Sequence, residues 1–206
     1  FNSENLTPAY GLYHIPEYMI IAELTATNRC GFFRFSWADP TNPAVIFDVN
    51  SDEGQGYIKI DPERREVIAS NPVHRIYNGN GQPAGFSGYM VARFDCDFAD
   101  FGPYADYQFY KGETELSNVS NLGAYVILKP SADDVVRVKI GTSFTSIENA
   151  RENLDAEIPD WDFNRVRAEL ENTWENLLNR IQVESGNKDE LTKFYTAIYH
   201  STIHPR

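Results

Sequence analysis

The chain contains 206 residues, with 18 basic and 30 acidic side chains and a formal net charge of −12. This length accommodates one complete domain and part of a second, because domains typically run to about 100 to 200 residues. The negative charge repels phosphate backbones and anionic membrane surfaces, which argues against a nucleic-acid partner. No apolar run approaches the roughly 20 residues of a membrane span. The sequence starts at Phe1 without a signal-peptide pattern, so we expect any targeting signal to have been removed or not included.

The first 145 or so residues have the pattern of short β-strands. Residues 18–27 alternate apolar and polar side chains, which is the period of a half-buried strand, and the same alternation recurs five times. Turn-forming clusters such as Asn50–Gly54 and Asn78–Gly81 separate the segments. The expected inward-facing residues are Tyr18, Ile20, Ala22, Leu24, Ala26; Val45, Phe47, Val49; Ile58, Ile60; Met90, Ala92, Phe94; Ala124, Val126, Leu128; and Val136, Val138, Ile140. Because no helical segment lies between them, this pattern predicts an antiparallel β-sandwich.

From about residue 161 the apolar period changes to 3.6, which is typical of helices. A first helix is predicted to begin after a cap at Asp160 or Asp162. A second is predicted after Asn187, which makes a capping-box pattern with Glu190. With the short turn 184–186 between them, the two helices predict an αα-hairpin, the unit of helical barrels. The apolar stripes are Val166, Leu170, Trp174, Leu177 and Ile181, then Leu191, Phe194, Tyr195, Ile198 and Tyr199.

Two motifs have the ligand spacing of metal sites but lack required residues. His200 and His204 are spaced as in His-Glu-x-x-His, yet Ser201 replaces the Glu and Pro205 disfavours helix at His204, so we interpret them as an ordinary helix end. The turn Asp48–Asp52 has the oxygen spacing of a calcium loop. However, Glu53 occupies its Gly position and Lys59 its bidentate Glu position, and Asp95–Asp100 departs further. We therefore predict no metal ligand in this chain.

Two glycine-containing motifs also lack features of the sites that they resemble. Gly79–Ala84 resembles a dinucleotide fingerprint but contains Pro83 and leads into a strand, and Gly85–Gly88 is not a nucleophile elbow because its context is β to β. Two of the tryptophans, Trp37 and Trp161, remain candidates for stacking on sugars, whereas Trp174 is expected in the core. The residues alone therefore assign no catalytic residue, and substrate-binding residues stay unknown.

Cys30 and Cys96 are the only cysteines, and each lies next to or within a predicted strand. One disulfide bond or two buried free thiols are both compatible with these positions. The pair therefore does not identify the redox compartment.

Four segments together resemble glycoside hydrolase family 92, the calcium-dependent exo-acting α-mannosidases. They are Ile21–Phe32, Val138–Leu154, Trp161–Arg167 and Phe194–Ser201, and they follow one another in the family's order along essentially the whole chain. The match departs from the family pattern at Asn2-Ser3 and at Cys30, and it is poor over residues 71–88.

The resemblance implies a β-sandwich packed on an (α/α)6 barrel, with the active site at their junction. It implies that calcium holds the O2 and O3 hydroxyls of mannose, that a Glu acts as general acid, and that an Asp activates water with inversion of configuration. In the family those acids and calcium ligands lie in the barrel beyond the last residue of this chain. The segment before Phe1, which contributes sugar contacts, is also absent from the sequence.

We therefore expect a mainly-β fold with a sandwich domain at residues 1–157, lacking its start, and a linker with the first helices of a truncated catalytic domain at 158–206. The expected function is that of an inverting, α-1,2-mannosidase-like enzyme in N-glycan degradation, with the fragment itself inactive and without a cofactor. Its expected partners are a mannose-containing glycan and its own barrel, in the periplasm or outside the cell. The alternative function is that of a non-catalytic carbohydrate-binding sandwich, and a third possible function is that of an interaction domain.

Overall fold

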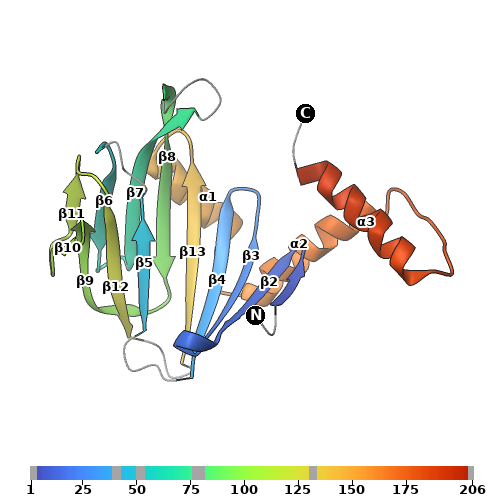
Figure 1. Ribbon diagram of the computed structural model, residues 1–206. Coiled ribbons are helices and arrows are strands. Elements are labelled where there is room, and N and C mark those ends of the chain that lie inside the picture. Colours follow the sequence, from blue (N-terminus) through green and yellow to red (C-terminus); the bar gives the residue numbers. More distant parts are fainter. Residues whose placement is uncertain (1–3, 39–42, 50–53, 76–81, 130–133, 204–206) are drawn as a thin grey trace.

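The computed structural model describes residues 4–38, 43–49, 54–75, 82–129 and 134–203. Two antiparallel sheets form its larger part (Figure 1). In strand order, the large sheet contains β1 (Glu4–Thr7), β2 (Tyr10–Ile15), β3 (Ile20–Ala26), β4 (Cys30–Trp37), β13 (Val135–Ser143), β8 (Gln82–Phe94), β7 (Glu66–Arg75), β6 (Tyr57–Asp61) and β11 (Glu115–Ser117). The small sheet contains β10 (Gln108–Phe109), β9 (Asp97–Ala105), β12 (Gly123–Lys129) and β5 (Ala44–Asp48).

Helices follow the strands, as the sequence predicts. They are α1 (Ile147–Glu157), α2 (Phe163–Leu178) and α3 (Lys188–Ile203), and a short 3-10 helix, η1 (Pro16–Tyr18), joins β2 to β3. In Figure 1 the small sheet lies in front of the large sheet and α1 lies behind the large sheet. Helices α2 and α3 extend to the right. The predicted mainly-β fold, an antiparallel sandwich followed by helices, is confirmed.

The first hydrophobic core lies between the two sheets. Alternation along each strand determines its members, because every second side chain points inward. Five of the six predicted inward-facing sets are found there, either fully buried, as Ile58, Phe94 and Val126 are, or packed against the buried residues, as Val49 and Met90 are. The period of two therefore identified the residues that hold the sheets together.

The prediction that the apolar residues of segment 18–27 face the core was wrong. Tyr18 lies in η1 and is 69% exposed, and the apolar residues of β3 are only half-buried. The buried residue of this strand is Thr25, whose hydroxyl donates to the carbonyl oxygen of Ala9 at 2.9 Å. The small sheet ends before it reaches β3 (Figure 1), so among the described strands none covers this face.

A second core lies on the other face of the large sheet, under the helices. Phe32, Val91 and Ile68 of the sheet pack there against α1 and the start of α2. From the helices and the segment between them, this core contains Ala150, Leu154, Ile158, Phe163 and Val166, each at most 2% exposed. The described molecule therefore has three layers, with the large sheet in the middle.

Helix α1 was not predicted: residues 147–157 were expected to belong to the sandwich domain, and the first helix was expected near residue 161. Ser146 caps α1 by accepting a hydrogen bond from the Asn149 N–H at 3.0 Å. The helix is mostly polar, and its buried residues are Ala150, Asn153 and Leu154. Such a short apolar stripe gives little periodic signal.

The two predicted helices are present with different ends. Asp162 is the cap of α2, and Ile181 lies beyond the helix and is 55% exposed. The connection runs over residues 179–187, which is longer than the predicted turn. Asn187 accepts from the Asp189 N–H as a cap does, but Glu190 accepts from the Ser185 hydroxyl and does not close a capping box.

The cysteines are both free and buried on opposite faces of the large sheet. Cys96 belongs to the core between the sheets, and Cys30 belongs to the core under the helices. Burial raises the pKa of Cys30 to about 11 and that of Cys96 to about 12, so both thiols stay protonated. Of the two alternatives, the free thiols are correct.

The close packing of α1 on β13 depends on Gly141. A Cβ atom at this position would lie 2.3 Å from the carbonyl oxygen of Ala150 and 2.8 Å from the Cβ of Leu154. We expect Gly141→Ala to lower the free energy of unfolding by about 1 to 3 kcal/mol through overpacking, measured by urea denaturation. As a control, Gly88→Ala meets no atom nearer than 4.0 Å and should change stability by less than about 0.5 kcal/mol. Equal losses in the two variants would contradict this close contact.

Candidate functional site: the junction of sandwich and helices

Of the residues considered as metal ligands, the structure describes only some. His200 is exposed on α3, and His204 and Asp52 lie outside the described residues. Asp95 is paired with Arg137 at 2.9 Å, and Asp97 and Asp100 are paired with other basic side chains. Within the part of the chain that the structure describes, no group of three or more His, Cys, Asp or Glu side chains could hold a metal ion.

The glycine motifs lie in or beside strand β8. Residues 79–81 lie outside the described residues, and Gly85–Gly88 forms part of β8. The predicted β-to-β context of the second motif is thus present, which is incompatible with a nucleophile elbow.

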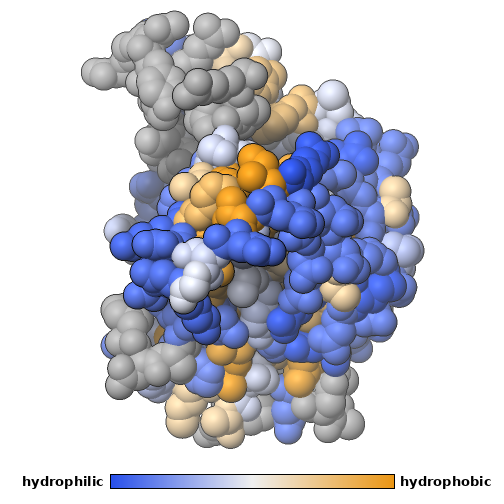
Figure 2. Space-filling model, turned by 90° about the vertical axis from the view of Figure 1, so that its right-hand side faces the viewer, coloured by the Kyte–Doolittle hydropathy of each residue, from blue (hydrophilic) through white to orange (hydrophobic). Residues whose placement is uncertain are grey.

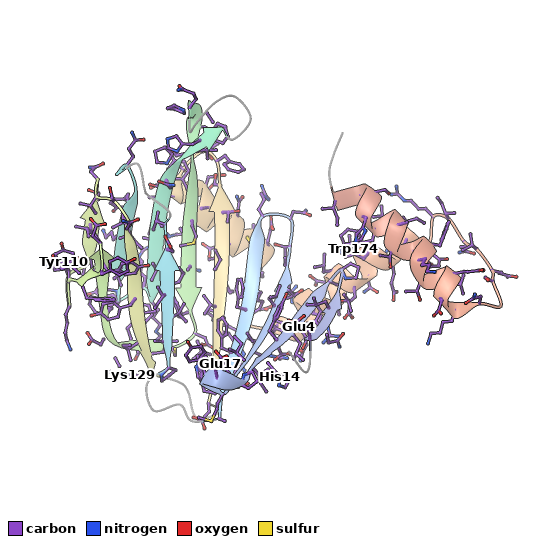
Figure 3. The ribbon with its side chains drawn as sticks, in the orientation of Figure 1. Glu4, His14, Glu17, Tyr110, Lys129 and Trp174 are labelled. Atoms are coloured by element: carbon purple, nitrogen blue, oxygen red, sulfur yellow. The ribbon has the colours of Figure 1, made fainter. Side chains whose placement is uncertain are left out.

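The three tryptophans have different surroundings. Trp37 is half-buried beside Phe35 and lines a 360 Å³ pocket with His14 and Ser36 at the lower end of the sandwich. Trp161 packs edge-on against Phe32 in the second core. Trp174 is not in a closed core as expected; it lies between α2 and α3 (Figure 3), where its ring contacts Tyr199 at 5.0 Å.

The end of α1 is tied to the turn between β3 and β4. Glu157 accepts hydrogen bonds from the Thr27 hydroxyl, from the Arg29 backbone N–H at 3.0 Å and from Arg29 Nε at 2.6 Å. Burial raises the pKa of Glu157, but these hydrogen bonds outweigh it and bring the pKa below its ordinary value. One carboxylate therefore joins α1 to a segment that lies about 130 residues earlier in the chain.

A second set of contacts holds the start of α2. Glu23 accepts both Nε and Nη2 of Arg34 at 2.6 Å and the Tyr10 hydroxyl at 2.7 Å. The Arg34 guanidinium lies 4.4 Å from the ring centre of Phe163, and that of Arg167 lies 3.8 Å from the ring centre of Tyr10. The hydrogen bonds from Arg34 hold the pKa of Glu23 below its ordinary value. Each arginine thus makes a cation–π contact across the boundary between the sheet and α2.

Lys139 connects the sheet to the segment between α1 and α2. Its side chain is 2% exposed, and Nζ donates to the carbonyl oxygens of Ile158 at 2.8 Å and Asp160 at 3.4 Å. Nζ also lies 4.3 Å from the ring centre of Trp161. Burial lowers the pKa of Lys139. The carbonyls at the end of a helix carry partial negative charge, so they compensate the buried ammonium group.

The remaining buried charge lies under the middle of α1. Glu66 is 1% exposed and accepts from Arg93 at 2.7 Å and from Arg151 of α1 at 2.9 Å. Arg93 also pairs with Asp155 of α1 at 2.6 Å. A buried carboxylate is costly unless it is fully paired, so Glu66 orients the helix on the sheet.

Two clefts open where the sandwich meets the helices. One, of 330 Å³, is lined by residues of β1–β3 and by Leu170 and Tyr199; the other, of 600 Å³, is lined by Thr27, Asn28 and the Trp174 side of α2. Neither cleft has an Asp or Glu among its described lining residues. Figure 2, which faces this end of the molecule, shows apolar surface in its upper half. The apolar residues of α3 are at most half-buried there.

Two packed sheets, with helices joined to the outer face of the large one by buried charges, give a fold that can be compared with known proteins. Residues 1–143 match the glycosyl hydrolase family 92 N-terminal domain, and residues 149–206 match the glycosyl hydrolase family 92 catalytic domain. The chain therefore belongs to glycoside hydrolase family 92. The resemblance stated from the sequence is confirmed, and the match covers only part of the catalytic domain.

Individual relatives agree with this assignment. An inverting family 92 mannosidase from Bacteroides thetaiotaomicron has a TM-score of 0.86 and 26% identity, and the alignment covers 98% of this chain and 26% of that one. A family 92 α-mannosidase from the same organism, also solved with mannoimidazole, has a TM-score of 0.83 and 25% identity over 98% of this chain and 28% of that one. An uncharacterized secreted glycosidase of Arthroderma benhamiae is 34% identical over 90 residues, which are 41% of this chain and 12% of that protein.

The chain thus spans about a quarter of the length of the solved relatives. The motifs that carried the resemblance now have structural roles. Thr27 and Arg29 bind the end of α1, and Glu23 binds Arg34 beside the start of α2. Gly141 allows α1 to pack closely on β13, and Trp161 and Phe163 pack in the second core. From the sequence, Glu23 was expected on the polar face of a half-buried strand and Trp161 was a candidate for stacking on a sugar, and no contact with a helix was predicted for either residue.

The carboxylate of Glu23 should make the junction sensitive to acid. Its pKa is lowered below 4.5 in the folded protein, so its ion pair contributes stability above about pH 4.5 and loses that contribution as the pH falls through the folded pKa. We expect Glu23→Gln to lower the urea midpoint at about pH 7 and to lose less stability than the unmutated chain between about pH 6 and pH 3.

Glu63→Gln is a matched control, because Glu63 is an exposed glutamate in the turn between β6 and β7. It should leave both the midpoint and its pH dependence unchanged. A pH dependence of Glu23→Gln that superimposes on that of the control would show that the Glu23–Arg34 pair does not stabilise the fold.

Proposed function

We propose that this chain forms the sandwich and the first helices of a longer exo-acting α-mannosidase that hydrolyses with inversion. The observation that carries the proposal is the alignment of 98% of the chain, at 26% identity, with a mannosidase described as inverting. Membership in the family limits the reaction to glycoside hydrolysis, and the relative solved with mannoimidazole supports mannose as the sugar.

The role of this part of the protein is to position the catalytic domain. Inverting hydrolysis uses one carboxylic acid to protonate the leaving oxygen and a second carboxylate to activate water, about 6.5 to 9.5 Å apart. The described lining of the junction clefts offers no carboxylate. We therefore assign no catalytic residue to this chain, and propose that both groups come from the remainder of the catalytic domain.

Calcium dependence is also a proposal for the longer protein. Calcium requires six to eight oxygen ligands, and among the described residues no acidic cluster offers them. The aspartates of the acidic turn at residues 95–100 are paired with Arg137, Arg65 and Lys111. The described residues do not fit the ion, so we propose that its ligands come from the remainder of the longer protein.

The substrate and location follow from the same proposal. We propose that the enzyme removes terminal α-linked mannose, with an α-1,2 preference, from mannose-containing glycans such as N-glycans. The relative described as a secreted glycosidase supports export to the periplasm or the medium. Within the described residues, no helix is long and apolar enough to cross a membrane.

A purely carbohydrate-binding sandwich is the second candidate, and an interaction domain is the third. Both are disfavoured because residues 149–206 match a catalytic domain and because α1 and α2 share a core with the sheet. A stand-alone sandwich would not need a catalytic helix to complete its core.

The longer protein that contains this chain should release mannose from α-1,2-mannobiose. We expect proton NMR to show β-mannose as the first product, because inversion changes the anomer, and EDTA to abolish release until calcium is added back. Release of α-mannose first, or full activity in EDTA, would contradict the mechanism proposed.

The 206-residue chain should show no turnover with the same substrate. The control is the same assay on the longer protein prepared in parallel, with equal molar amounts. Turnover by the short chain that survives repurification would show that a catalytic pair lies within it.

A further inference from the structure

The outer face of the small sheet carries a cluster of aromatic rings that takes no part in the junction. Phe109 of β10 contacts both Tyr104 of β9 and Tyr125 of β12, with its ring centre 5.6 Å from each of theirs. Ile46 of β5 pairs with Tyr125 in the sheet and is 64% exposed, and Phe109 is 60% exposed. We call these four residues the aromatic platform.

Strand alternation places the platform outside the core. The neighbours of these residues along the chain, Phe47, Ala124 and Val126, point into the core between the sheets, so Ile46 and Tyr125 point the other way. In Figure 1 this outer face lies in front, whereas α1 lies behind the large sheet. Figure 3 places Tyr110, next to Phe109 in sequence, at the far edge of the small sheet from the helices. The platform and the junction are therefore on different sides of the molecule.

Two glycines give the platform its shape. A Cβ at Gly123 would lie 2.2 Å from the Tyr104 ring, so only glycine lets this ring lie against the backbone of β12. The Tyr104 hydroxyl donates to the carbonyl oxygen of Phe47 at 3.3 Å, which fixes the ring in place. A Cβ at Gly102 would lie 2.3 Å from the carbonyl oxygen of Tyr110, so glycine there lets the segment after β10 pack close. The rings are held in position before any ligand arrives, which reduces the entropy lost on binding.

Charged groups lie near Tyr125, where Asp100 and Lys111 both act on its phenol. Lys111 pairs with Asp100 at 2.7 Å, and the Asn121 amide donates to Asp106 at 2.6 Å. Burial raises the pKa of both Tyr104 and Tyr125, so their phenols stay neutral. Exposed rings with hydrogen-bonding groups at their margin match a pyranose, whose apolar C–H face stacks on a ring while its hydroxyls face outward.

We propose that the aromatic platform binds a chain of neutral hexose units, as a second glycan contact separate from the proposed active site. The patch is too small for a stable protein interface: with about 150 to 250 Å² per aromatic side chain, its exposed area is on the order of 300 Å², against about 800 Å² per partner in a standard interface. The carboxylates nearby and the net charge of −12 disfavour an anionic sugar. This contact would hold the enzyme on a polymer while another site cleaves it.

The test is affinity electrophoresis of the 206-residue chain in gels that contain soluble α-mannan or soluble β-glucan, with polygalacturonate as the anionic comparison. We expect retardation by at least one neutral polymer and none by polygalacturonate. Phe109→Ala should weaken the retardation about three- to tenfold, as expected for the loss of one stacked ring. Phe109 is exposed and lies in a two-residue strand, so the variant should fold, which near-UV circular dichroism would check.

The matched control is Phe144→Ala, because Phe144 is also an exposed phenylalanine, at 70%, and its ring contact is with Phe86 away from the small sheet. It should retain full retardation. No retardation by either neutral polymer, or equal loss in both variants, would overturn the proposal. Self-association through the platform, seen by sedimentation and removed by Phe109→Ala without any sugar binding, would also overturn it. Because the assay measures binding without turnover, its outcome is independent of whether the longer protein is a mannosidase.

Discussion

The fold depends on covering the outer face of the large sheet. Phe32, Val91 and Ile68 are buried there by α1 and by the first turn of α2, and each large apolar side chain buried contributes roughly 1.5 to 3 kcal/mol. Without the helices this face would be an exposed apolar surface. The sandwich and the start of the helical part therefore fold as one unit, although the family's two domain matches meet between residues 143 and 149.

Apolar contacts supply most of this stability, but they do not fix the orientation of the helices on the sheet, because the hydrophobic effect is not directional. That orientation comes from charged groups that cross the junction. Glu157 binds Arg29, Glu66 binds Arg93 and Arg151, and Lys139 lies against the ring of Trp161. In a glycoside hydrolase this matters because a small displacement of a catalytic group can reduce the rate about a hundredfold. The sandwich thus acts as a rigid base for the helices that follow it.

The sequence was sufficient to predict a strand and its buried residues where one face of that strand is fully covered. Strand β12 alternates from Ala124 to Leu128, because the large sheet buries every other residue of it. The sequence failed for α1, whose buried stripe is short, and for β3, which the small sheet does not cover. Buried charges such as Lys139 and Glu66 could not be predicted either, since their partners lie 19 to 85 residues away in sequence. The family motifs pointed to the junction but not to the contacts that form it.

Amide hydrogen exchange on the 206-residue chain tests the shared core most directly. Residues buried against the sheet should open only with the whole fold, so the amides of α1 and of the first turn of α2 should be protected to nearly the same degree as those of β13. Helix α3, which buries none of its residues, should exchange orders of magnitude faster. If α1 exchanged as fast as α3 while β13 stayed protected, the helices would be an appendage of the sandwich and not part of its core.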